Sequence, residues 1–99
     1  WGGQTVGLRA PDYPLVQSIL RQLGYPLAGT AANVSGSEPT NDAALIVEEF
    51  SKAAPQTDLV IDAGVLPDSL PSTVVDLSGR MPRILRQGAV RADKILALL

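Results

Sequence analysis

The chain has 99 residues, 45% of them hydrophobic and 18% charged, so it is long enough for one domain at most and too apolar for a disordered segment. It contains no histidine and no cysteine, which excludes imidazole and thiol catalysis, disulfides and a structural zinc site. The formal net charge of −2 provides no overall basic field that would attract nucleic acid.

The first predicted element is a strand at residues 5–9. Its apolar residues, Val6 and Leu8, share one face, whereas Thr5 and Arg9 share the other. The alternation predicts a strand with one apolar and one polar side.

A helix is predicted over residues 15–23, where apolar side chains recur at helical spacing. Asp12 is its candidate N-cap, and Gly24 followed by Pro26 is typical of a helix end. We expect the apolar stripe of this helix to lie in the core.

The run of small residues at 29–36 is the most informative part of the chain. It overlaps a predicted strand at 26–33, on which Gly29, Ala31 and Asn33 share one face. Small side chains bury little apolar area, but they let backbone amides and short hydroxyls approach a ligand closely. The run is therefore a candidate binding site.

A second helix is predicted after this run. Thr40 or Asn41 is its candidate N-cap, its apolar residues continue from Ala43 to Ala54 at helical spacing, and Pro55 ends it. This stripe is also expected in the core.

The last part of the chain is predicted to form short strands and a helix. The strands lie at residues 58–62, 72–77 and 83–86, and a helical stripe follows at 92–99. The predicted element order is β-α-β-α-β-β-β-α, which indicates a mixed α/β (α+β) domain.

Four segments carry a resemblance to a known family, namely residues 6–12, 30–36, 72–76 and 83–88. In order and spacing they resemble the C-terminal half of YrdC-like threonylcarbamoyl-AMP synthases, and the resemblance covers residues 4–99. It implies a YrdC-like twisted mixed sheet with flanking helices around a concave cavity. Residues 1–99 are then expected to form the C-terminal part of a single domain of this kind.

The resemblance also implies an activity. Enzymes of this family make threonylcarbamoyl-AMP from L-threonine, bicarbonate and ATP, with release of pyrophosphate and, we expect, with magnesium. Downstream machinery transfers the threonylcarbamoyl group to tRNA. We expect a cytoplasmic protein, since no apolar run reaches the roughly 18 residues that span a bilayer.

The resemblance implies two sets of contact positions and neither a catalytic nucleophile nor a metal ligand. The nucleotide-contact positions are Thr5, Ala31, Asn33, Pro39 and Arg86. The threonine-contact positions are Arg9, Gly29 and Ser72. The residue types agree in part, because a planar guanidinium can bind both oxygens of a carboxylate and an arginine beside phosphates stabilises the charge that moves during nucleotidyl transfer.

The chain departs from the family pattern in two ways. Ala31 stands where the family has serine, and losing one charge-assisted hydrogen bond to a phosphate costs about 1.5–3 kcal/mol. The family's Lys-Arg-x-Arg segment, which lies in its N-terminal half, has no equivalent here. We therefore expect this chain to be one part of a longer or split domain, and to be inactive when isolated.

Two alternative functions remain open. One is the related YrdC-like domain of carbamoyltransferases and hydrogenase maturation proteins, although the segment at 72–76 fits the synthases better. The other is a non-catalytic RNA-binding module, for which four arginines form a candidate basic strip: Arg80, Arg83, Arg86 and Arg91.

Overall fold

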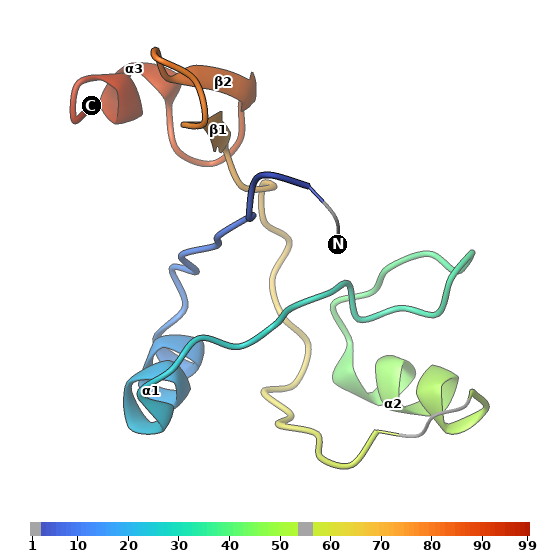
Figure 1. The fold of residues 1–99 in the computed structure, drawn as a ribbon. Helices are drawn as coiled ribbons and strands as arrows, with labels where there is room; N and C mark the ends of the chain where they lie inside the picture. The colour runs from blue at the N-terminus through green and yellow to red at the C-terminus, as the bar shows by residue number, and fades with distance from the viewer. Residues whose placement is uncertain (1–2, 54–56) are drawn as a thin grey trace. The chain divides into compact units, whose positions relative to one another are not determined.

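The computed structural model describes residues 3–53 and 57–99. Its elements follow the order α1, α2, β1, β2, α3 (Figure 1). The chain divides into two compact units, Trp1–Ala32 and Asn33–Leu99. Within the described residues, no helix has both the length and the apolar character needed to span a bilayer.

Helix α1, Pro14–Leu23, is the regular element of the first unit and confirms the first predicted helix. It ends as expected, because Gly24 adopts a left-handed φ of 73° and its N–H donates to the carbonyl of Leu20 at 3.0 Å. The predicted N-cap, Asp12, is wrong. Tyr13 holds that position without a side-chain cap, and Pro14 at the helix start has no N–H to satisfy.

The two strands predicted in the first unit are absent from the described residues. The segments at 5–9 and 26–33 have no hydrogen-bonded neighbour strand. The sequence at 5–9 nevertheless alternates, with apolar residues at Val6 and Leu8. Both of these side chains are exposed. Alternation makes a segment suitable for a sheet, but a strand exists only where a second strand pairs with it.

Helix α2, Ala43–Ser51, lies in the second unit and begins one to two residues later than predicted. Its N-cap is Asp42, whose Oδ1 accepts a hydrogen bond from the N–H of Ala44 at 2.9 Å. Thr40 instead accepts from the N–H of Asp42, and Asn41 donates to Asp68. The helix ends at Ser51 with Lys52 as its C-cap, so the prediction that it continues to Ala54 is wrong, and the predicted end at residues 54–55 lies outside the described residues.

Strands β1, Val74–Asp76, and β2, Arg83–Arg86, form an antiparallel pair with an irregularity between Val74 and Val75. The sequence prediction for 83–86 is therefore confirmed, and that for 72–77 is confirmed in its centre. Helix α3, Ala92–Leu96, ends before the predicted stripe does. The predicted strand at 58–62 does not form, and an isolated bridge instead joins Asp42 to Val65.

None of the described side chains is fully buried, so the expectation that the stripes of α1 and α2 form a core is wrong for this structure. Leu15 on α1 and Leu45 on α2 remain 39% and 52% exposed. A helical stripe is buried only where another element covers it. The mixed content of helices and a small antiparallel sheet agrees with the predicted α/β class, while the twisted sheet and cavity remain expectations.

Candidate functional site

The predicted contact residues fall in both units. Thr5, Arg9, Gly29 and Ala31 belong to the first unit, where all four are exposed on extended segments before and after α1. Asn33, Pro39, Ser72 and Arg86 belong to the second unit. There Asn33 is half-buried, and the other three are exposed.

The structure brings two predicted residues of the second unit together. Arg86, the last residue of β2, donates from Nε and Nη2 to the carbonyl oxygen of Ser72 at 3.2 and 2.9 Å. Pairing of β1 with β2 makes this contact possible, because Val74 lies opposite Arg86. The guanidinium has further N–H donors, which leaves it able to bind an anionic group as well.

The backbone around Ser72 is held by a second set of contacts that the sequence analysis missed. The N–H of Gly88 donates to Thr73 Oγ1 at 2.9 Å, and that hydroxyl donates to the carbonyl of Val90 at 2.5 Å. A Cβ at Gly88 would lie 2.1 Å from the carbonyl oxygen of Pro71. Only glycine fits this close approach, and the signal in the sequence was a glycine two residues after the predicted strand at 83–86.

The small-residue run forms a tight turn at residues 34–37. The N–H of Ser37 donates to the carbonyl of Val34 at 3.0 Å, and Gly36 has a φ of 93°. Since Ser35 does not have a positive φ, this is the pattern of a type II turn, which requires glycine at its third position. Asn33, which precedes the turn, contacts its last residue, because Asn33 Nδ2 donates to the carbonyl of Ser37 at 3.0 Å.

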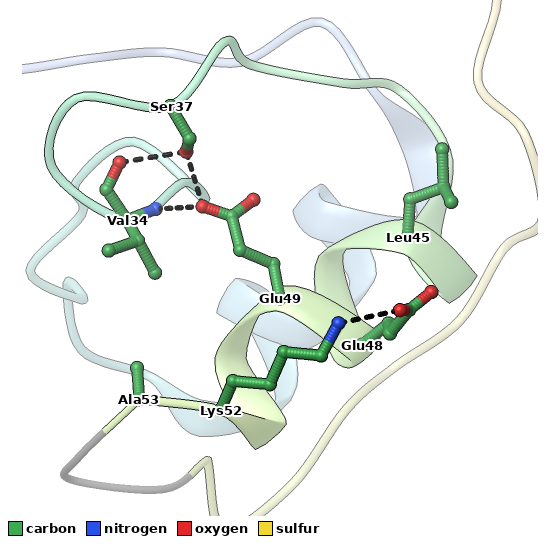
Figure 2. A pocket seen from close by; sticks show the side chains of 7 residues that line it. All are labelled: Val34, Ser37, Leu45, Glu48, Glu49, Lys52 and Ala53. Atoms are coloured by element: carbon green, nitrogen blue, oxygen red, sulfur yellow. Dashed lines mark hydrogen bonds and ion pairs between the residues drawn. The ribbon is translucent and has the colours of Figure 1, made fainter.

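Glu49 on α2 holds this turn against the helix (Figure 2). Its Oε1 accepts from the N–H of Val34 at 2.7 Å and from the hydroxyl of Ser37. Glu49 is not among the residues predicted from the sequence. The signal in the sequence was its position in the last turn of the predicted helix. A carboxylate there is repelled by the negative end of the helix dipole, so a hydrogen-bond donor beside it would stabilise it.

A hollow of about 410 Å³ lies between the turn and α2 (Figure 2). Its charged groups are satisfied within the hollow, since Lys52 Nζ lies 2.7 Å from Glu48 Oε1 and this hydrogen bond lowers the pKa of Glu48. None of the predicted contact residues belongs to its lining, which consists of Val34, Ser37, Leu45, Glu48, Glu49, Lys52 and Ala53. The hollow therefore marks where the turn rests on the helix.

Three members of the candidate basic strip already have partners. Arg91 Nε lies 3.0 Å from Asp93 Oδ1, and Arg83 Nη2 lies 3.9 Å from Asp76 Oδ2. Arg86 donates to the carbonyl of Ser72, as described above. The two members with carboxylate partners, Arg83 and Arg91, are less available for phosphates, so the strip does not favour the RNA-binding alternative.

The acidic residues do not gather into a metal site. Across residues 3–53 and 57–99, no three carboxylate, imidazole or thiol side chains come close enough to hold a metal ion.

Comparison of the sequence with models of known protein families shows the class of protein to which this turn, the β1–β2 pair and the Ser72–Arg86 contact belong. The sequence model of the Sua5/YciO/YrdC family, whose description reads "Telomere recombination", matches residues 2–88. The chain therefore belongs to this family, and the resemblance drawn from its four segments is confirmed.

Individual relatives agree with this assignment. A Mycobacterium tuberculosis protein is 38% identical over 95 residues, which cover 96% of this chain and 42% of the relative. The "Uncharacterized protein YciO" of Escherichia coli is 37% identical over 86 residues, which cover 86% of this chain and 40% of that protein. The threonylcarbamoyl-AMP synthase of Mus musculus is 43% identical over 81 residues, and the match covers 76% of this chain and 28% of that protein.

The chain spans about two fifths of the length of the first two of these relatives. No solved structure matches it.

Proposed function

We propose that the protein carrying this chain is a threonylcarbamoyl-AMP synthase, which converts L-threonine, bicarbonate and ATP into threonylcarbamoyl-AMP and pyrophosphate. The observation that carries this proposal is the family match over residues 2–88 together with relatives that bear the synthase name. In this proposal residues 1–99 are the C-terminal part of a single YrdC-like domain.

The contact positions are proposed in two sets. Thr5, Ala31, Asn33, Pro39 and Arg86 contact the nucleotide, whereas Arg9, Gly29 and Ser72 contact threonine. The bond from Arg86 to the Ser72 carbonyl supports a shared site, because it joins one member of each set within the second unit.

The turn that follows Asn33 has a defined part in this proposal. The Nδ2 of Asn33 already donates to the turn carbonyls, so its Oδ1 and the small-residue backbone are the groups left to meet a nucleotide. The guanidinium of Arg86 supplies positive charge near the phosphates. Such a site accelerates the reaction by orienting the substrates and neutralising charge, without a covalent nucleophile.

We also propose the wider setting. The ATP enters with magnesium bound to its phosphates, the product passes to the machinery that modifies tRNA, and the protein acts in the cytoplasm without a membrane. The names of the synthase relatives support the substrates and the role in tRNA modification.

The test is threonine-dependent release of pyrophosphate by the full-length protein. We expect release only when L-threonine, bicarbonate and ATP are all present, and a loss of at least about tenfold in kcat/KM for Arg86→Ala. Arg80→Ala is the matched control, because Arg80 lies in the turn between the same two strands. The melting temperature of each variant shows whether its fold is retained.

Other outcomes would favour the alternatives. Pyrophosphate release that does not require threonine would support the carbamoyltransferase or hydrogenase-maturation reading. RNA binding that weakens with salt, in a protein that releases no pyrophosphate, would support the RNA-binding module. Either result would overturn the proposed function.

A further inference from the structure

We infer that Glu49 is a positioning residue of the nucleotide site: its carboxylate fixes the turn at residues 34–37, and thereby the Asn33 position that the proposed function places beside the nucleotide. The inference rests on that function. Glu49 lies outside the four segments of the family resemblance, and the proposed set of contact residues does not include it.

Glu49 contacts both ends of the turn. A single oxygen, Glu49 Oε1, accepts from both ends of the turn, namely the N–H of Val34 at 2.7 Å and the hydroxyl of Ser37 (Figure 2). The two donors lie 15 and 12 residues from Glu49 in the sequence. The carboxylate therefore ties a glycine-containing turn to a regular helix.

The hydrogen bonds of Glu49 continue through Ser37 to Asn33. Ser37, which donates to Glu49 through its hydroxyl, accepts from Asn33 Nδ2 through its carbonyl at 3.0 Å. The next residue, Val34, donates its N–H to the same carboxylate. Asn33 is thus held between two groups that Glu49 anchors, and the orientation of its side chain depends on the carboxylate.

The neighbouring acid, Glu48, differs from Glu49 in its surroundings. Glu48 precedes Glu49 on α2 but is exposed and pairs with Lys52 one turn further along the helix. An exposed pair of this kind contributes little. Glu49 is half-buried, and charge-assisted bonds in such surroundings are stronger and more directional. Glu48 therefore provides a matched control at the adjacent position.

The experiment compares three variants of the full-length protein: Glu49→Ala, Glu49→Gln and Glu48→Ala. The readouts are KM for ATP, KM for threonine and kcat. Loss of the anchor in Glu49→Ala should raise KM for ATP at least about tenfold, with a smaller change in kcat and in KM for threonine. Glu49→Gln keeps an oxygen acceptor and should stay within about threefold of the wild type.

Hydrogen exchange at the Val34 amide gives a second readout that needs no nucleotide. Exchange should be faster in Glu49→Ala and close to that of the wild type in Glu49→Gln and Glu48→Ala. A wild-type protein that fails to bind ATP would overturn the proposed function. Normal ATP binding by the wild type, with unchanged KM for ATP or unchanged Val34 exchange in Glu49→Ala, would overturn the inference alone. An equal rise in KM in Glu48→Ala would also overturn it.

Discussion

Arg86 binds the backbone carbonyl of Ser72 rather than its hydroxyl, through hydrogen bonds of 3.2 Å from Nε and 2.9 Å from Nη2. The two side chains therefore have separable roles. The arginine holds the strand entry in place, and the serine hydroxyl is not needed for that bond. This separation makes the proposed threonine contact of Ser72 testable without disturbing Arg86.

Ser72→Ala is expected to weaken threonine binding while leaving the fold and ATP binding unchanged. The substitution removes only the hydroxyl, and the carbonyl that accepts from Arg86 remains. We expect KM for threonine to rise about fivefold or more, which corresponds to one lost hydrogen bond. A KM for threonine equal to that of the wild type, in steady-state assays of the full-length protein, would remove Ser72 from the site.

Gly88→Ala is expected to destabilise the protein. The added Cβ would lie 2.1 Å from the Pro71 carbonyl oxygen and 2.4 Å from the Ser72 carbonyl carbon, so the backbone has to move. Overpacking of this kind costs about 1–3 kcal/mol of the free energy of unfolding, which urea denaturation measures. Gly79→Ala is the control, because the nearest atom to its Cβ is 3.9 Å away. Equal stability of the two variants would contradict this account.

Asp76 is expected to make stability depend on pH in the acid range. The hydroxyl of Ser78, then its N–H, and more weakly Arg83, hold the pKa of Asp76 below its ordinary value of 3.8. A carboxyl whose pKa is lower in the folded state stabilises the fold above the unfolded pKa. That contribution is lost as the pH falls below 3.8 and through the folded-state pKa.

Ser78→Ala tests the origin of this effect. Removing the hydroxyl should move the pKa of Asp76 upward toward 3.8, though not fully, because the N–H of residue 78 still donates to Asp76. A carbon-13 NMR titration of the Asp76 carboxyl measures the shift. Ser69→Ala serves as the control, and a Ser78→Ala titration identical to that of the wild type would refute the assignment.

Ala31→Ser is expected to improve the proposed enzyme. The family resemblance places a serine at this position, and its hydroxyl would donate one hydrogen bond to a nucleotide phosphate. A charge-assisted bond is worth about 1.5–3 kcal/mol, so ATP affinity or turnover should rise by about tenfold or more. Unchanged steady-state kinetics would show that another donor already serves the phosphate or that residue 31 does not face it.

The sequence by itself determined the elements whose hydrogen bonds are local. Helical spacing and the Gly24 stop predicted α1, and helical spacing from Ala43 onward predicted α2. A helix satisfies its backbone within four residues, so the necessary information is contained in the segment. The four ordered segments also determined the family.

Only the tertiary structure decided which predicted strands form and which side chains meet. The segments at 5–9, 26–33 and 58–62 alternate or are apolar, yet none acquires a partner strand in the described part of the chain. The contacts of Arg86 with Ser72 and of Glu49 with Val34 join residues 14 and 15 positions apart. Such contacts depend on how the chain folds back, which no local pattern encodes.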